Sequence, residues 1–385
     1  MTAQLKPSWQ AALALLLVVI ALVLGAMTQP EADALASPAA GVAYPYLGTK
    51  SVILGLIGLA ALGSMLRLRP LAEALLLFVG AHGAAWLLLA GIGGFEGTAK
   101  APYYCALTAA WLLGWRCVAV LSSMRPAERW ERLALNLVVP ALFGAWLLIL
   151  WEAVVRGAGI PFILLPPPSA IGARIVNSLP ILGEDVRQTI FKAVLVGYVV
   201  GCAAGFVVAI LADRFLFLRR GLIPIGNLVS ALPIIGVAPI MVMWFGFDWQ
   251  SKAAVVIIMT FFPMLVNTVA GLAASSHMER DLMRTYASSY WQTLFKLRLP
   301  AAGPFIFNAL KINSTLALIG AIVAEFFGTP VVGMGFRIST EVGRMNIDMV
   351  WAEIAVAALA GSVFYGVVAL LERAATFWHP SIRGG

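Results

Sequence analysis

Polar residues inside apolar stretches are the first candidates for chemistry in this sequence. Lys311 lies in such a stretch, and Asn308, Ser314 and Thr315 fall on the same side of a helix at spacings of three and four residues. A charged side chain in apolar surroundings is costly unless it faces protein or water, so this stripe predicts a polar face. The alternative is that Lys311 extends its amine to a nearby aqueous boundary. Glu325 follows about 21 Å further along the same helix, too far to pair with Lys311.

Metal ligands and nucleophiles do not form a recognisable set. The cysteines and histidines stand singly: Cys105, Cys117, Cys202, His82, His277 and His379. No CxxC pair and no convergent catalytic group occurs, so neither a metal site nor an enzymatic centre is expected. Glu73 and Glu152 have no visible partner in the sequence and are expected to make structural hydrogen bonds. The ATP-binding pattern G-x-x-x-x-G-K-[ST] is absent, and the GTKS at residues 48–51 has the wrong order, so the chain itself is not expected to hydrolyse ATP.

A basic, amphipathic segment at residues 277–300 is too polar to cross a membrane. Ser289 and Gln292 have the spacing of a capping box, which predicts a short helix beginning at Tyr290. Trp291, Leu294 and Phe295 follow at helical spacing and predict one apolar face. Leu299-Pro300 ends the segment, and proline suits the first turn of the next helix. From periodicity alone, a helix lying flat on a membrane surface explains the pattern equally well.

The elements that must position these residues are membrane helices. Of 385 residues, 61% are hydrophobic and 11% are charged, whereas about 25% of a soluble domain is charged. Ten segments approach the roughly 20 apolar residues that a membrane span requires. They are residues 9–27, 52–66, 71–94, 101–121, 133–155, 190–212, 222–244, 253–272, 305–327 and 350–371. The first could instead be a secretory signal peptide, because small residues (34–36) follow it. We expect an uncleaved helix and an all-α integral membrane protein.

The distribution of positive charge orients these helices. Arg and Lys are more frequent in alternate loops. This bias predicts that both termini and residues 273–300 lie on the cytoplasmic side of a bacterial inner membrane. The net charge of +8 is explained by this bias, and no basic stretch with stacking aromatics indicates nucleic acid. A polar, arginine-rich stretch at residues 123–132 predicts a cytoplasmic linker. It would separate a four-helix extension (1–122) from a six-helix core (133–380).

The amphipathic segment resembles the EAA loop of ABC importer permeases. That loop reads Glu-Ala-Ala, three residues, Gly, nine residues, Ile, one residue, Leu-Pro. The fit is better to the branch that imports nitrate, sulfonates and taurine. The positions that follow the branch are Arg284, Thr285, Ser288, Ser289, Trp291, Phe295, Leu299 and Pro300. Residues 164–171, 232–247, 261–272 and 320–328 resemble the same branch in the same order, so the resemblance covers about residues 133–380.

The resemblance implies the permease subunit of an ATP-driven importer, with a type I six-helix core. Its partners would be cytoplasmic ATPase subunits that bind ATP, an extracytoplasmic substrate-binding protein and a second permease copy, with no cofactor in this chain. The residues that would couple to the ATPase are Arg284, Tyr286, Ala287, Ser288, Ser289, Trp291, Phe295, Leu299 and Pro300. Those that would line the translocation pathway are Asn308, Lys311, Ser314, Thr315 and Glu325. The branch carries small solutes, including nitrate, sulfonates, taurine and the pyrimidine precursors of thiamine.

Ala287 departs from the family pattern, which has glycine at this position. A turn glycine often has a left-handed backbone, which costs alanine about 1 kcal/mol. Either the turn accepts a right-handed residue here, or coupling to the ATPase is weaker than usual. Three prolines and two glycines in residues 222–244 predict a kinked helix or a broken one that lines the pathway. An ion-coupled carrier is the alternative function, but inverted repeats and paired acids at mid-membrane are not seen.

Overall fold

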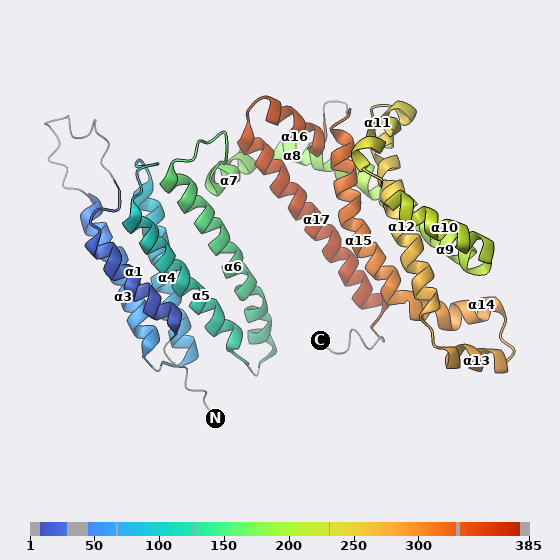
Figure 1. Cartoon of the computed structure of the whole chain (residues 1–385), viewed down its shortest axis with the longest axis horizontal. Helices are drawn as coiled ribbons and strands as arrows, with labels where there is room; N and C mark the ends of the chain where they lie inside the picture. The colour runs from blue at the N-terminus through green and yellow to red at the C-terminus, as the bar shows by residue number, and fades with distance from the viewer. Residues whose placement is uncertain are drawn as a thin grey trace. The chain divides into compact units, whose positions relative to one another are not determined.

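The computed structural model describes residues 8–28, 45–66, 68–126, 128–230, 232–328 and 332–377 (Figure 1). The chain is 84% helical, and its described residues form no strand, only an isolated bridge between Thr28 and Ala99. It divides into two compact units, Met1–Ile171 and Gly172–Gly385. The all-α prediction is confirmed.

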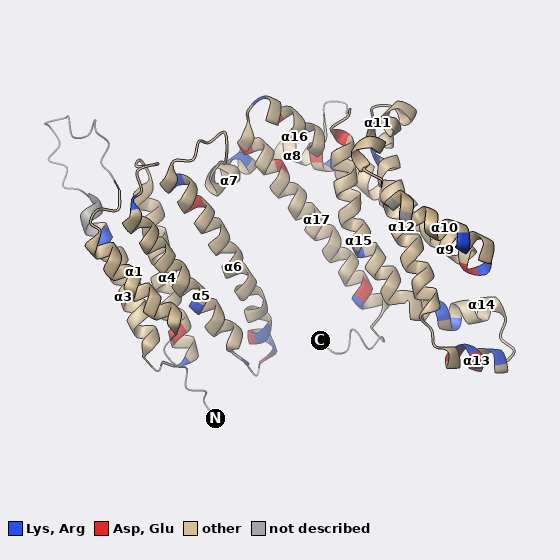
Figure 2. Ribbon diagram, in the orientation of Figure 1, with Lys and Arg blue, Asp and Glu red and all other residues tan. Residues whose placement is uncertain are grey.

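Within the described residues, seven helices are long and apolar enough to cross a membrane. Three shorter apolar helices, Trp9–Val23, Thr49–Met65 and Ile234–Phe245, account for the remaining predicted spans. Lys and Arg gather at helix ends and on the short helices outside these spans (Figure 2). The chain is therefore a multi-pass membrane protein. The small residues 34–36, on which the signal-peptide alternative depends, lie outside the described residues.

The described part of the first unit up to residue 158 contains five helices. They are α1 (Trp9–Val23), α3 (Pro45–Met65), α4 (Pro70–Ile92), α5 (Ala101–Ser123) and α6 (Arg129–Ala158). Its core is rich in alanine, and an ideal Cβ at Gly80 would lie 2.3 Å from the Cβ of Ala60. Small residues let membrane helices approach closely, and the resulting van der Waals contact replaces the hydrophobic effect that lipid does not supply. The same chemistry explains why α3 and α4 pack closely.

Two glutamates tie the helices of this unit together. Glu73 accepts hydrogen bonds from Ser64 and Arg116, both at 3.0 Å. Glu152 accepts from the backbone and side chain of Ser169 at 2.9 and 2.7 Å. The prediction that both glutamates make structural hydrogen bonds is confirmed. Helix α6 packs against α5 and α4 within this unit, so its predicted place in a core beginning at residue 133 stays a prediction.

The second unit is built around three long helices. α9 (Leu195–Arg214), α12 (Trp249–Ala273) and α15 (Leu299–Glu325) share its main packing. On α9, Gly197, Gly201 and Gly205 form a stripe at spacings of four residues that faces α12. An ideal Cβ at Gly201 would lie 2.1 Å from Thr260 Oγ1, so a larger residue would push the two helices apart.

The remaining elements, of which α17 is long and the others are shorter, complete the second unit. They are α7 (Pro168–Asn177), α8 (Leu179–Val186), η1 (Arg187–Val194), α10 (Leu216–Ser230), α11 (Ile234–Phe245), α13 (His277–Thr285), α14 (Tyr290–Thr293), η2 (Leu294–Arg298), α16 (Met334–Gly343) and α17 (Ile347–Ala375). Helix α7 begins just before the division between the units. The segment at residues 222–244 is a broken helix rather than a kinked one, because the chain forms α10 and α11 there. Pro233 immediately precedes α11. Its ring disfavours a helical backbone in the preceding residue, and it has no N–H that could continue the hydrogen bonds of α10.

Candidate functional site

The amphipathic segment forms two short helices outside the long apolar ones (Figure 1). Ser276 caps α13, since its side chain accepts from the N–H of Glu279 at 3.2 Å and Glu279 accepts from the N–H of Ser276 at 2.8 Å. Ser289 and Gln292 make the same reciprocal pair at the start of α14, at 3.3 and 2.8 Å. The predicted capping box and the helix beginning at Tyr290 are confirmed. Each helix therefore begins at a fixed residue without help from a partner.

The turn between α13 and α14 is strained at Ala287. Its φ is +52°, in the left-handed region that alanine seldom adopts. The N–H of Ala287 donates to the carbonyl of Arg284 at 2.9 Å, and that of Ser288 donates to Met283 at 3.0 Å. The alternative that this position accepts a right-handed residue is therefore wrong. Alanine occupies the conformation that the family's glycine would favour.

The aromatic face formed by α14 and η2 is exposed. Trp291 and Phe295 are 58% and 62% exposed, and their rings stack with centroids 6.1 Å apart. Leu294 does not share this face: it is fully buried against Leu272 and Ala302. The three-residue face expected from an α-helical period is wrong at Leu294. Residues 294–298 form a π-helical turn (η2), which changes the direction in which successive side chains point.

A buried ion pair holds this segment to α9. Arg298 donates to both carboxylate oxygens of Asp213 at 2.7 Å, and its Nε donates to the carbonyl of Leu272 at 2.9 Å. The hydroxyl of Tyr290 donates to the same Asp213 at 3.0 Å. The Asp213 and Arg298 side chains are 5% and 15% exposed. Bidentate geometry fixes direction as well as distance, so α14 keeps a defined orientation relative to α9 and α15.

The remaining predicted coupling residues differ in their surroundings. Arg284 pairs with Asp281 at 3.4 Å, but both side chains are largely exposed, so the pair contributes little. Tyr286 is 77% exposed beside the turn. Leu299 and Pro300 form the first turn of α15, as the sequence predicts. The segment from Tyr290 to Glu325 is thus a continuous run of helical turns.

The predicted pathway residues on α15 differ in their surroundings. Lys311 pairs with Glu372 of α17 at 2.7 Å, a partner that neither the pathway nor the surface interpretation includes. Ser314 is buried and donates to the carbonyl of Lys311 at 2.7 Å, whereas Asn308 and Thr315 are exposed. Their role in transport stays a prediction. A neighbour that the sequence analysis missed, Asn313, is fully buried and donates to the carbonyl of Thr260 at 2.7 Å.

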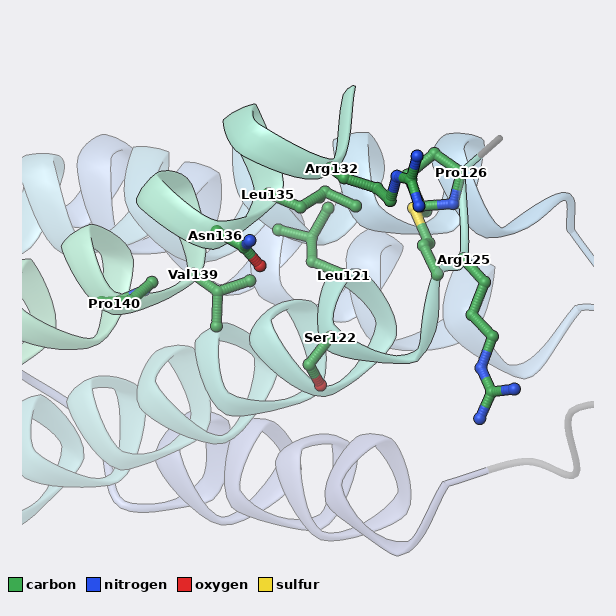
Figure 3. Close-up of a pocket in the computed structure, with 10 residues that line it drawn as sticks. Leu121, Ser122, Arg125, Pro126, Arg132, Leu135, Asn136, Val139 and Pro140 are labelled. Carbon is green, nitrogen blue, oxygen red and sulfur yellow. The ribbon is translucent and has the colours of Figure 1, made fainter. Parts of the chain in front are cut away.

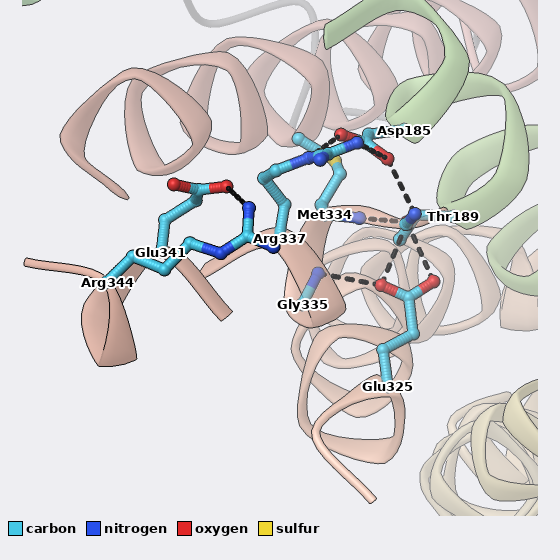
Figure 4. A network of polar contacts seen from close by, with 9 residues as sticks. Asp185, Thr189, Glu325, Met334, Gly335, Arg337, Glu341 and Arg344 are labelled. Atoms are coloured by element: carbon cyan, nitrogen blue, oxygen red, sulfur yellow. Dashed lines mark hydrogen bonds and ion pairs between the residues drawn. The ribbon is translucent and has the colours of Figure 1, made fainter. Parts of the chain in front are cut away.

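Glu325 lies at the far end of α15, in the polar network that Figure 4 shows. It accepts from Thr189 at 2.8 and 3.0 Å and from the N–H of Gly335 at 2.7 Å. Asp185 accepts from the N–H of Gly333 at 2.6 Å and from Arg337 at 2.8 Å. The hydrogen bond with Asp185 raises the pKa of Arg337, so its guanidinium stays charged. Carboxylates satisfy the free N–H groups at the start of α16, which is a structural role.

Fold and segment together define an all-α protein of the membrane with a basic, amphipathic segment outside its long helices. Residues 197–377 match the family described as binding-protein-dependent transport system inner membrane component. The chain is 31% identical to the formylaminopyrimidine transport permease protein of Halalkalibacterium halodurans over 243 residues, which cover 62% of this chain and 95% of the relative. It is 28% identical to the riboflavin transport system permease protein of Chloroflexus aurantiacus (67% and 95% covered). It is 26% identical to the taurine transport system permease protein of Escherichia coli (62% and 89% covered).

The chain belongs to this family, the inner-membrane permeases of binding-protein-dependent ABC importers. It is therefore a transport subunit, and the alternative of an ion-coupled carrier is not supported. The matched residues 197–377 lie entirely in the second unit and include the amphipathic segment at residues 277–300 and the network around Glu325. Helices α1 to α6 lie outside them.

Proposed function

We propose that the exposed Trp291–Phe295 face of α14 is the docking surface for a separate ATPase subunit, which binds the ATP. The observation that supports this most directly is the pair of stacked, exposed aromatic rings on a helix that is capped at one end and continuous with α15 at the other. Large aromatic side chains at the centre of an interface commonly dominate its binding energy. A helix lying flat on lipid has no need of the buried Asp213–Arg298 pair that orients it.

Coupling then follows from the rigidity of the segment. A displacement of α14 by the ATPase passes through η2 into α15, and through Asp213 into α9. Both long helices pack against α12, so the three move as one group. Two permease copies whose segments approach each other would switch the pathway between inward- and outward-open states. The assembly we propose is a homodimer with two ATPases and an extracytoplasmic binding protein.

The substrate we propose is a small solute of the kind that the relatives' names give. A cavity of about 140 Å³ lies at the break between α10 and α11 and is lined by apolar residues of α10, α11, α12 and α15. None of its described lining residues is charged, which favours a neutral ring such as a formylaminopyrimidine over a small zwitterion with two full charges such as taurine. Uptake of each labelled solute into proteoliposomes holding the assembled importer would separate the two classes.

The test of docking is the double substitution Trp291→Ala and Phe295→Ala. Each central aromatic anchor contributes about 2 kcal/mol or more, or roughly thirtyfold in affinity, so the ATPase should dissociate during purification and uptake should cease. The matched control is Trp86→Ala with Trp130→Ala, which removes two tryptophans of the first unit that are 73% and 77% exposed. The control should keep the ATPase. Full ATPase binding by the Trp291/Phe295 variant would favour the flat membrane-surface helix instead.

The orientation we propose places both termini and the coupling segment in the cytoplasm, as the distribution of positive charge predicts. Single cysteines at Ser276 and Ser339, which lie before α13 and within α16, report on the two sides. An impermeant maleimide should label position 339 in intact cells and leave position 276 unlabelled. Labelling of position 276 from outside would reverse the topology and remove the ATPase from reach of α14.

A further inference from the structure

Two cavities lie along the same face of the α5–α6 pair in the first unit. One, of about 540 Å³, lies at the end where α5 passes into α6, and its lining includes Leu121, Arg125, Arg132, Asn136 and Val139. The other, of about 340 Å³, has an almost wholly apolar lining that includes Trp111, Trp115, Phe143 and Trp146. Neither cavity belongs to the region matched by the permease family.

The spacing of the lining residues shows that the two cavities share one groove. On α5 they run from Trp111 to Ser122, and on α6 from Arg132 to Trp146, at intervals of one, three and four residues. Such intervals keep side chains on one side of a helix. The α5 stretch is about 17 Å long, close to the roughly 15 Å depth of one leaflet's hydrocarbon layer. The groove therefore has a polar end followed by an apolar wall, and its length is close to that of one acyl chain.

The polar end of the groove is basic. Arg125 and Arg132 are exposed, and neither forms an ion pair with a carboxylate of the described residues. No acidic residue contributes to the described lining. In Figure 3, Asn136 and Val139 point from α6 toward α5, Arg132 reaches toward Pro126, and Arg125 projects from the loop. Both guanidinium groups are free to turn toward an anion at the mouth.

Two further features place this end among lipid headgroups. Pro140 has no N–H, so the carbonyl of Asn136 lacks its usual intrahelical donor at the edge of the cavity. In a membrane such a carbonyl needs another donor, which a headgroup hydroxyl supplies. Trp130, one turn before the groove, is 77% exposed, and exposed tryptophan at a helix end is typical of the membrane interface.

We propose that this groove binds an anionic phospholipid. Its phosphate lies between Arg125 and Arg132, a headgroup hydroxyl donates to the Asn136 carbonyl, and one acyl chain lies against Trp111, Trp115 and Phe143. Basic pockets between membrane helices bind the phosphates of anionic lipids in this way. The apolar wall favours a lipid over free phosphate, because free phosphate has no acyl chain to bury against it.

The experiment titrates dioleoyl phosphatidylglycerol against the full-length protein in detergent, with bound lipid counted by native mass spectrometry. Arg125→Gln with Arg132→Gln should weaken binding about thirtyfold. The matched control, Arg129→Gln with Arg220→Gln, removes the same charge from exposed residues outside the lining and should bind as the unaltered protein does. Val118→Trp fills the apolar part of the groove and should also weaken binding while both arginines remain.

Three results would overturn the proposal. Equal binding by the Arg125/Arg132 variant would show that the arginines do not hold the headgroup. An equal loss in the Arg129/Arg220 control would show only general attraction to a charged surface. Displacement of the lipid by an excess of inorganic phosphate, together with full binding by Val118→Trp, would make the site one for a free anion. Elution as a single species with unchanged thermal unfolding establishes that each variant is folded.

Discussion

The two ends of α15 are tied to the rest of the second unit by different chemistry. At the coupling end, Arg298 and Tyr290 bind Asp213 at the end of α9, while Trp291 and Phe295 remain exposed. At the far end, Glu325 is 1% exposed, and its oxygens accept from Thr189 and from the start of α16. One end leaves binding groups for a partner, whereas the other satisfies its polar groups internally. Under the proposed docking, the difference separates the end that meets a partner from the end that the unit holds closed by its own contacts.

The largest expected effect is at the closed end. Asp185→Ala leaves Arg337 and the N–H of Gly333 without their buried acceptor, which should lower the free energy of unfolding by about 4 kcal/mol. Thermal unfolding in detergent measures the loss. Asp185→Asn, which keeps an acceptor oxygen, should lose less. ATPase affinity of the folded fraction should not change, and a parallel loss of affinity would remove the distinction between the two ends.

A somewhat smaller loss is expected at the coupling end. Asp213→Ala leaves the guanidinium of Arg298 unpaired, but Arg298 is 15% exposed and has Leu272 as a second partner, so the cost should be about 3 kcal/mol. Unlike Asp185→Ala, this change should also weaken ATPase binding, because α14 loses its orientation. Pull-down of the ATPase by the folded variant measures this. Unchanged binding would show that the caps alone position α14.

A gain of stability is expected at the turn. Ala287→Gly removes the left-handed strain of alanine and should stabilise the protein by about 1 kcal/mol, with uptake equal to or above that of the unaltered chain. Ala287→Val, which adds a β-branch at the same φ, should lower stability. Chemical unfolding of the three proteins in parallel gives the comparison. A loss of stability in the glycine variant would contradict the inference that the backbone of Ala287 is strained.

The smallest effect is expected at Arg284. Its pair with Asp281 is exposed, so Arg284→Gln should change the free energy of unfolding by less than about 0.5 kcal/mol. ATPase affinity is the informative measurement here, because Arg284 lies on the surface that we expect to face the partner. A salt-dependent fall in affinity would extend the docking surface onto α13. No change would restrict it to α14.

Local patterns were predictable from the sequence, and distant pairings were not. The capping box of Ser289 and Gln292 follows from two residue types three positions apart, and the spans follow from the lengths of apolar runs. Asp213 could not be assigned, because its partner Arg298 lies 85 residues away. Asp185 and Arg337 are 152 residues apart, and the sequence around neither residue indicates that the two pair. Leu294 was misplaced because a π-helical turn does not show in an α-helical period.

The π-helical turn η2 lets the amphipathic segment accept a change in length without a change in direction. A π turn holds one residue more than an α turn over the same hydrogen-bonded length. Deleting Lys296 would therefore let α14 and α15 join as an ordinary α-helix in nearly their present orientation, because the π turn already absorbs the extra residue. Trp291 would still face the proposed partner, with every long helix in place. A protein shortened in this way would be stable, membrane-inserted and still able to respond to its proposed motor.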